Sequence, residues 1–400
     1  MSLNVESLTQ HTGEGLLTDQ FDRQSFAEQI HELFIGSNPG SLRTDGTAQI
    51  EERNEPVPPV PPRKRLRTAI LIMLAGGAAY DFFGKTIYEL APGSDAGVQG
   101  LMRDKWLSWL LTLVSFLAGA IPPIFSSENR NAFRGADANL YIKLVAPSFC
   151  DFFVTGSRFI ALVFLPPSVV GIMKNSVQLL TVAFLSSMRG KKLAKVQWLS
   201  FLPQIAGDVV VGVASSMTGQ SGSSKHGGKR VLGVLIVIGS GIMGGFRNIV
   251  EEMVLQDYDF PDGALLMAES LFSGVLVLIV GVVFALAFDQ SGFLNMFGMV
   301  FTSPLIILCV VLFSVCSYGK DAGKLKLTKR ASTVLTKVLC LVMPFGTWII
   351  SLVFFGISVV AKWEPRVGEN WSSPWDEVRL AGFVLIMFGS VVFVRAKKKK

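Results

Sequence analysis

The chain has 400 residues, of which 50% are hydrophobic and only 17% charged, with a formal net charge of +7. Soluble domains are about 25% charged, so this composition excludes a water-soluble globule and predicts an all-α polytopic membrane protein. The four cysteines lie in apolar runs, and GxxxxGK[ST], GxSxG and HExxH patterns are absent. We therefore expect no enzyme activity, no cofactor and no metal site. The basic balance is typical of membrane-protein loops and does not require nucleic acid.

Residues 1–66 are polar and predict a cytosolic, mostly disordered tail. The tail ends in a proline-rich linker. Within it, the PxxPxR arrangement from Pro58 to Arg63 fits a ligand of an SH3-type partner. The alternative interpretation is a stiff spacer before the first membrane span.

Ten apolar segments follow, each about long enough to cross a bilayer. They must be helices, because an open strand cannot satisfy its backbone polar groups in lipid. The lipid bilayer is thus the first expected partner. The predicted spans are 67–87, 105–125, 140–164, 168–188, 195–216, 230–254, 262–288, 298–318, 333–360 and 377–395.

Lys and Arg are concentrated on one side of these spans, twenty against nine, which predicts that both termini face the cytosol. This count places Lys320 and Lys324 in a cytosolic loop. Lys337, near the cytosolic end of the ninth span, is expected to extend its ammonium to the interface. The Asn370-Trp-Ser372 sequon then lies on the opposite side and is a candidate glycosylation site.

The sequence also contains a weak internal repeat five spans apart. Gly207 in Gln204–Val211 matches Gly389 in Met387–Phe393, and the small residues of 75–79 match those of 239–245. The match predicts two inverted five-helix repeats, 67–216 and 217–400, an arrangement typical of secondary transporters. Small residues also let helices pack closely, which is compatible with a homodimer.

Several stretches in this order resemble the drug/metabolite transporter superfamily of EamA type. Within it, they are similar to the F-type branch of solute carrier family 35, near its sixth member. More distant resemblances are to the chloroquine-resistance and nucleotide-sugar transporters. The resemblance implies a fold of five plus five helices and transport of a small-molecule solute. One departure is the ninth span, where 339–347 is largely apolar. The stretches are Pro147-Ser-Phe-Cys-Asp151, Gly171-Ile-Met-Lys-Asn175, Gln197-Trp-Leu-Ser200, 205–212, Glu251-Glu252 and 268–274.

Ionisable residues inside spans cost about 2.5–3.5 kcal/mol each on insertion scales and need a reason to be there. Lys174 is the leading candidate, because a buried ammonium is a natural partner for a phosphate or carboxylate. We expect six residues to bind substrate. The alternative for Asp151 is pairing with a neighbouring helix, and the alternative for Arg247 is an ion pair with Glu251 on its own helix. The six are Asp151, Lys174, Asn175, Gln178, Arg247 and Glu269.

Two further acidic residues are candidates for gating or coupling. Glu251 lies four residues after Arg247, where an intrahelical ion pair is the alternative, and Asp208 lies mid-span, where a packing role is the alternative. Glu269 has no basic partner on its own helix, which makes it a candidate for proton coupling as well.

These observations predict a secondary-active transporter that moves a small polar organic solute by alternating access, through exchange or proton coupling. The alternative is a transport-inactive scaffold or regulator that acts through the tail. Lys397 and Lys398 fit a di-lysine retrieval signal read by coat proteins, or else a basic anchor of the last span. They favour an endomembrane, Golgi or ER, with lysosome or vacuole as alternatives.

Overall fold

The computed structural model describes residues 63–90, 98–136, 138–165, 167–191, 193–217, 227–362, 367–371 and 373–396. The chain divides into two units, Met1–Thr68 and Ala69–Lys400. The proline-rich pattern as far as residue 62 and the C-terminal Lys397 and Lys398 lie outside the described residues, so the predictions made for them stay predictions.

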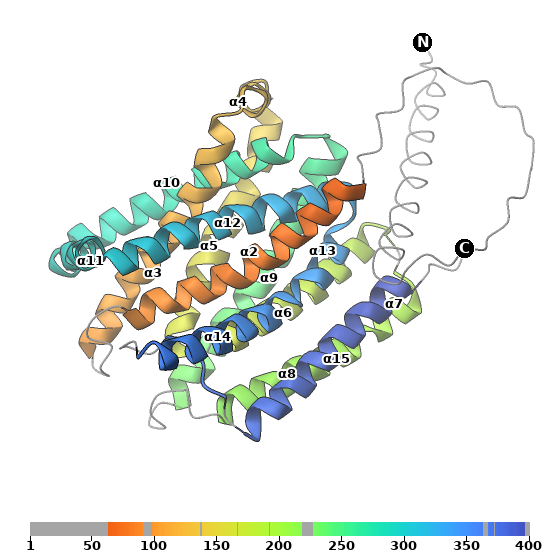
Figure 1. Cartoon of the computed structure of the whole chain (residues 1–400). Coiled ribbons are helices and arrows are strands. Elements are labelled where there is room, and N and C mark those ends of the chain that lie inside the picture. The colour runs from red at the N-terminus through yellow and green to blue at the C-terminus, as the bar shows by residue number, and fades with distance from the viewer. Residues whose placement is uncertain are drawn as a thin grey trace, which may run out of the picture. The chain divides into compact units, whose positions relative to one another are not determined.

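Every regular element in the described part of the chain is a helix (Figure 1). This confirms the all-α fold that the composition predicts. The helices are α2 (Arg63–Leu90), α3 (Val98–Ile124), α4 (Ser127–Arg134), α5 (Ala138–Phe164), α6 (Pro167–Met188), α7 (Lys195–Leu199), α8 (Phe201–Met217), α9 (Gly227–Asp257), α10 (Asp262–Phe288), α11 (Gln290–Thr302), α12 (Pro304–Arg330), α13 (Thr333–Cys340), α14 (Met343–Val360) and α15 (Trp375–Arg395).

Nine segments of the described chain are long and apolar enough to cross a membrane, which confirms a polytopic membrane protein. They correspond to nine of the ten predicted spans. The predicted third span is α5, a helix of 27 residues. It is not among the nine described segments. It nevertheless packs between α3, α9 and α10, in the interior of the bundle.

The predicted span 298–318 and the loop that follows it need correction. The structure divides this region at Ser303, and α12 then continues to Arg330. Lys320 and Lys324 therefore lie in a helix and not in a loop. Their charges are compensated there, because Lys320 pairs with Asp321 and Lys324 pairs with Glu251. The orientation inferred from counting basic residues stays a prediction.

Glycines bring α8 and α15 into close contact, and Figure 1 shows the two helices side by side at one edge of the bundle. A Cβ on Gly207 would meet the backbone of Gly382, and one on Gly389 would meet Gln204 and Ser200. The matched glycines of the predicted repeat thus pack within one chain. The homodimer remains a prediction. These small residues no longer support it, because they pack two helices of the same chain together.

The other matched segments, 75–79 and 239–245, also bring helices close together. Gly76 and Gly77 bring α2 against α12 and Met343, while Gly244 and Gly245 bring α9 against α6. In each case a helix of one predicted repeat approaches a helix of the other at close range. The division of the chain into repeats itself remains a prediction.

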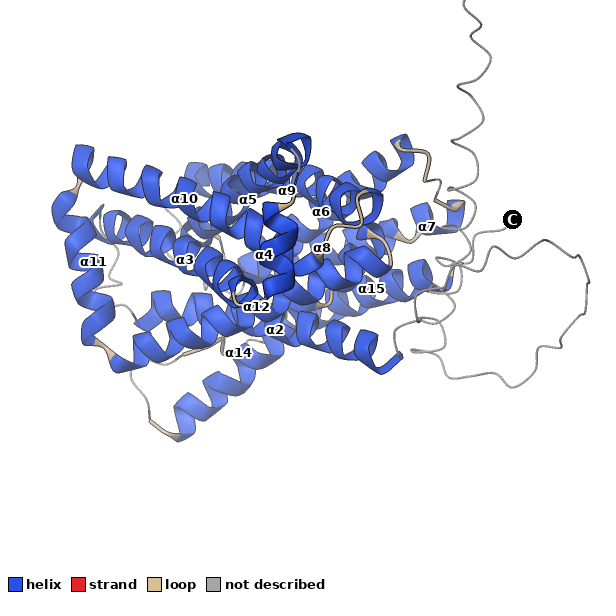
Figure 2. Ribbon diagram, turned by 90° about the horizontal axis from the view of Figure 1, so that it is seen from above, coloured by secondary structure: helices blue, strands red, loops and turns tan. Residues whose placement is uncertain are grey.

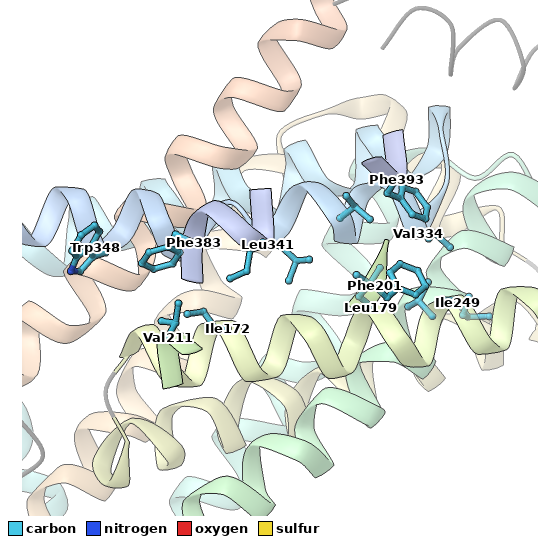
Figure 3. Packing of buried hydrophobic residues seen from close by; sticks show 14 residues of the cluster. Ile172, Leu179, Phe201, Val211, Ile249, Val334, Leu341, Trp348, Phe383 and Phe393 are labelled. Carbon is cyan, nitrogen blue, oxygen red and sulfur yellow. The ribbon is translucent and has the colours of Figure 1, made fainter. Parts of the chain in front are cut away.

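Buried apolar side chains fill the space between α6, α8, α13, α14 and α15 (Figure 3). Phe201 and Phe393 stack at one end of this cluster, and Trp348 and Phe383 meet at the other. Large apolar residues are also widely exposed, especially on α10 from Val275 to Phe288. Such outward faces suit contact with lipid. Figure 2 shows α11 against α3 and α10, at one edge of the bundle.

Candidate functional site

A cavity lies between the helices in the middle of the bundle, with a volume of about 90 Å³. Side chains from α2, α3, α5, α6, α9, α10, α12, α13 and α14 line it, so both predicted repeats contribute. Among the described residues, six cations and three carboxylates reach its surface. The cations are Arg158, Lys174, Arg247, Lys320, Lys324 and Lys337, and the acids are Asp81, Asp151 and Asp321.

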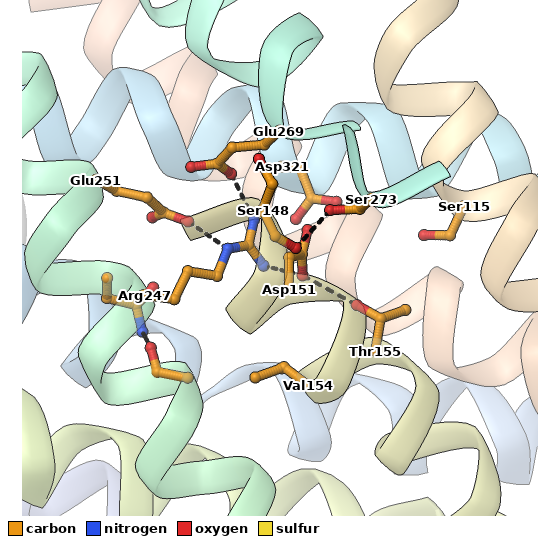
Figure 4. A network of polar contacts seen from close by, with 12 residues as sticks. Ser115, Ser148, Asp151, Val154, Thr155, Arg247, Glu251, Glu269, Ser273 and Asp321 are labelled. Carbon is orange, nitrogen blue, oxygen red and sulfur yellow. Dashed lines mark hydrogen bonds and ion pairs between the residues drawn. The ribbon is translucent and has the colours of Figure 1, made fainter. Parts of the chain in front are cut away.

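Arg247 of α9 is the centre of an ion cluster that joins three helices (Figure 4). Its Nε lies 2.6 Å from Glu251 on the same helix, and its Nη2 lies 2.9 Å from Glu269 of α10. Its Nη1 donates to Asp151 of α5. The spacing of four residues between Arg247 and Glu251 allows the intrahelical pair, as the sequence suggested. One guanidinium therefore serves three carboxylates.

The two glutamates of this cluster lie behind the cavity wall and are fully buried. Glu251 has a second cationic partner, because Lys324 of α12 approaches it to 2.8 Å. Glu269 meets the cavity only through Arg247, and its Oε1 has no hydrogen-bond partner among the described residues. The carboxylates of the cluster are thus unequally compensated, and Glu269 has the fewest partners.

A second group of charges surrounds Tyr80 on α2. Arg158 pairs with Asp81 and lies 4.8 Å from the centre of the Tyr80 ring, and the Lys320 ammonium lies 3.7 Å from that centre. Tyr80 in turn stacks on Phe313 of α12, with 4.5 Å between ring centres. The aromatic ring therefore holds two cations at one wall of the cavity.

Lys174 and Lys337 are the cavity cations without a carboxylate partner. No described residue forms an ion pair or hydrogen bond with Lys174. Lys337 is 5% exposed and donates to Gln178 at 2.8 Å. The expectation that Lys337 extends to the interface is therefore wrong. Its helix presents it to the interior, where an amide oxygen on α6 accepts from its ammonium.

The apolar stretch 339–347 of the ninth span contains a helix break. α13 ends at Cys340 and α14 begins at Met343, with Pro344 in its first turn. The Asn175 amide donates to the Cys340 carbonyl at 3.3 Å. The break adds backbone polarity to the cavity wall and brings the positive end of the α14 dipole close to it. The sequence predicted no polar contribution here because only side chains were considered.

The structure brings most predicted substrate residues together. Asp151, Lys174, Asn175, Gln178 and Arg247 line the cavity, and Glu251 and Glu269 reach it through Arg247. Asp208 does not line the cavity: it lies on α8 and accepts a hydrogen bond from Ser176 of α6.

Sequence reasoning missed several cavity residues. Asp81 lies mid-span in an apolar helix, so the same insertion-cost argument that selected Asp151 would have found it. Lys320, Asp321 and Lys324 were hidden by the assumption that a charged run ends a span. Lys337 was assigned to the interface because of its place near a helix end.

Ion pairs also close the bundle at both ends. At one end, Lys85 of α2 lies 3.3 Å from Glu369, and Arg379 of α15 lies 2.7 Å from the same carboxylate. At the other end, Lys191 lies 3.0 Å from Glu252 of α9. The sequon residue Asn370 is exposed in the loop beside Glu369, and its glycosylation stays a prediction.

Burial of Glu369 raises its pKa, but the charges of Lys85 and Arg379 outweigh this effect, so the pKa lies below its usual value. The carboxylate is therefore held in its charged form. Gly368 beside it has a φ of +104°, and a Cβ there would meet the Ser351 carbonyl. Only glycine fits this close approach of the loop to α14.

Comparison with known proteins finds relatives at low identity. No protein-family model matches the chain. It is 24% identical over 258 residues to solute carrier family 35 member F6 of Pongo abelii and, equally, of Homo sapiens. The match covers 62% of this chain and 65% of each relative, so the chain spans about two thirds of their length. A solved crystal structure with 18% sequence identity has a TM-score of 0.53, over 82% of this chain and 96% of the other.

The helices, their apolar outer faces and the enclosed charges together define a multi-pass, all-α integral membrane protein with an interior polar site. The chain is similar to a member of solute carrier family 35, in the F-type branch that its sequence motifs resemble. The relatives are named as carriers and not as enzymes.

Proposed function

We propose that the chain is a secondary-active carrier that moves a small polar organic solute across an endomembrane by alternating access. The observation that carries this proposal is the central charged cavity, which contains a lysine, Lys174, that pairs with no residue in the described part of the chain. A buried charge is costly unless it is compensated, so a solute is the natural counter-charge. The relationship to solute carriers supports the same function.

The charge of the cavity favours a solute with an acidic group. In the described residues, six cations face three lining carboxylates and the two buried ones, Glu251 and Glu269. Lys174, Lys337 and Gln178 all line the cavity, and neither lysine has a carboxylate partner among the described residues. An ammonium pair of this kind suits a carboxylate or phosphate, as in a nucleotide sugar or another acidic metabolite. The present volume accommodates such a group, and larger parts of a solute require the helices to separate.

The ion pairs at the two ends suit alternating access. Lys85 and Arg379 share Glu369 at one end, and Lys191 holds Glu252 at the other. In the proposed cycle, one of these groups separates when the cavity opens to its side, while the other remains paired. The predicted inverted repeats would give the two openings similar energies.

Uptake by purified protein in liposomes tests the proposal. The liposomes are empty or preloaded, and the panel contains nucleotide sugars, phosphorylated sugars, amino acids, peptides and cationic drugs. We expect uptake of an acidic member, reduced at least about tenfold in Lys174→Gln, the loss expected for about 1.4 kcal/mol of binding. The matched control is Lys195→Gln, since Lys195 is exposed on α7, away from the cavity.

Each result has a definite meaning for the proposal. Uptake of cationic solutes only, unaffected by Lys174→Gln, would refute the acidic solute and leave a carrier. Absence of uptake of every compound, by protein that remains folded, would refute the carrier and favour the scaffold that acts through residues 1–66.

The endomembrane location rests on Lys397 and Lys398 as a proposed retrieval signal for coat proteins. We expect Lys397→Ser with Lys398→Ser to move a fluorescently tagged protein from Golgi and ER membranes to later compartments. An unchanged location would refute a retrieval function for these two lysines.

A further inference from the structure

Arg247 is shared between the cavity and the buried carboxylates behind it. Its side chain is 11% exposed and lines the cavity, while Glu251 and Glu269 on its far side are completely buried. Figure 4 shows the guanidinium between these glutamates and Asp151. Any ligand that draws Arg247 toward the cavity must weaken its contact with at least one of the three acids.

Glu269 is the acid that depends most on Arg247. Asp151 also accepts from Thr155, at 3.0 Å, and Glu251 also pairs with Lys324. Among the described residues, Glu269 has only the Nη2 contact at 2.9 Å, and its buried Oε1 has no hydrogen-bond partner. A buried carboxylate that loses its cation is costly, and binding a proton removes the charge.

The surroundings of Glu269 offer no replacement for Arg247. The charged groups that face it are Arg247 and Glu251 of α9, Asp151 of α5 and Lys324 of α12. Of these, Lys324 is engaged by Glu251. From residue 106 to its end, α3 carries no ionisable side chain, and neither does α11; the charged residues of α4 are exposed.

We infer that Glu269 is a proton-binding site that couples proton movement to solute movement, a statement that rests on the proposed carrier function. An acidic solute in the cavity pairs with Arg247, and the guanidinium relaxes its hold on Glu269. The carboxylate then takes a proton from hydronium on the open side: an O–H bond of the hydronium breaks, an O–H bond forms at Oε1, and neutral water remains. When the solute leaves on the other side, Arg247 returns and the proton is released there.

The sign of the coupling follows from linkage. Solute and proton each favour the state in which Arg247 is directed toward the cavity, so each increases the affinity of the other. The inference is therefore symport of the acidic solute with a proton. Exchange of one solute for another needs no net proton transfer and does not depend on Glu269.

The test compares two modes of uptake in the same proteoliposomes, with the acidic compounds of the panel as probes. One mode is accumulation driven by an inward proton gradient of one pH unit, which permits up to about tenfold accumulation of a monoanion, because one unit is worth about 1.4 kcal/mol. The other mode is exchange between preloaded and external solute at equal pH. We expect Glu269→Gln to abolish accumulation and to retain exchange.

Two further variants complete the design. Glu377→Gln is the matched control, because Glu377 is exposed on α15 and should keep both modes. Glu269→Asp retains a carboxyl group and should keep gradient-driven accumulation with a shifted pH midpoint. If Glu269→Gln does not fold, this shift, together with proton entry measured by a pH dye inside wild-type liposomes, tests the same statement.

The failures are distinguishable. Accumulation that persists in Glu269→Gln, or wild-type uptake that ignores the gradient and moves no proton, would overturn the inference and leave the carrier intact. No uptake in either mode by folded wild-type protein would instead remove the proposed function on which the inference rests.

Discussion

Two arginines in this chain each hold several carboxylates in a buried setting, yet their surroundings differ. Arg379 on α15 is 2% exposed, contacts Glu369 at 2.7 Å and Asp376 at 3.2 Å, and is not among the residues that line the central cavity. Arg247 on α9 is 11% exposed and lines the central cavity. One guanidinium is enclosed by its partners, and the other has one side accessible to a ligand.

This difference teaches how to separate a structural ion cluster from a functional one. Both clusters are costly to bury, and their charges match only while every partner is present. Where protein encloses the cation completely, a change of partner requires the helices to separate. Where a cavity borders the cation, water or a solute can replace a carboxylate. Burial alone therefore does not identify a binding site.

The largest expected effect is the loss of stability in Arg379→Gln. The substitution leaves Glu369 and Asp376 buried without their arginine, which typically costs about 3–5 kcal/mol. Arg247→Gln should cost less, because cavity water and protonation can compensate its carboxylates. Thermal unfolding of both variants in detergent measures the difference.

Equal losses of stability in the two variants would contradict this difference. The cavity would then not reduce the cost of removing Arg247. Arg395→Gln is the control for a change of charge on α15. Arg395 lies at the end of that helix, and its replacement should leave the unfolding midpoint unchanged.

The next largest loss of stability is expected in the apolar contact between α8 and α15. This contact contains no charges, so it serves as a reference for the ion clusters around Arg379 and Arg247. Gly207→Leu places a side chain where the Gly382 backbone and Ile386 lie. Overpacking of this kind typically costs about 1–3 kcal/mol. Gly212→Leu is the matched control, because among the described residues no atom of another helix lies within 4 Å of a Cβ at Gly212. Similar unfolding midpoints for the two variants would contradict the packing described for α8.

A smaller effect is expected from Lys337→Gln. This substitution tests whether the charged site around Arg247 extends to Lys337 on α13. The substitution removes the donor to Gln178 and one of the two cavity cations without a carboxylate. Hydrogen bonds to charged groups contribute about 1.5–3 kcal/mol, so we expect uptake of acidic solutes to fall about tenfold. Lys326→Gln, exposed on α12, is the control. Unchanged uptake would restrict the anion site to Lys174.

The sequence was sufficient to predict the helical membrane fold, because apolar runs of span length leave no other structure in lipid. It was insufficient where tertiary contacts compensate charge. Lys324 interrupts an apolar pattern in one dimension, but in the bundle it meets Glu251 and remains in the helix. The break between α13 and α14 was invisible for a different reason: its polarity comes from backbone groups.

The candidate site was predictable in part for the same physical reason. Asp151, Lys174 and Arg247 stood out because an ionisable residue inside a span needs compensation, and the structure places all three at one cavity. Which charges meet could not be read from spacing, except for Arg247 with Glu251. The contacts of Arg247 with α5 and α10 depend on how helices far apart in sequence pack together.

The smallest expected effect is the pH dependence of the stability that the ion cluster around Arg379 contributes. Burial raises the pKa of Glu369, but the charges of Lys85 and Arg379 lower it by a larger amount. Its pKa in the folded state therefore lies below the ordinary 4.5. A group with a lowered folded pKa contributes stability that is complete above its unfolded pKa and is lost as pH falls through the folded value. The contribution should therefore be present from neutral pH to about 4.5 and decline below it.

Unfolding midpoints in detergent between pH 6 and pH 3.5 measure this decline against Glu369→Gln, which lacks the titrating group. The advantage of the wild type over the variant should shrink on acidification by a few degrees, since about 1 kcal/mol moves the midpoint of a chain of a few hundred residues by roughly 2–4 °C. Exposed Glu377→Gln should show the same pH dependence as the wild type. If the difference in unfolding midpoint between the wild type and Glu369→Gln stays constant or grows at low pH, Lys85 and Arg379 do not hold Glu369 in its charged form. The cluster around Arg379 would then depend on packing and not on its ion pairs.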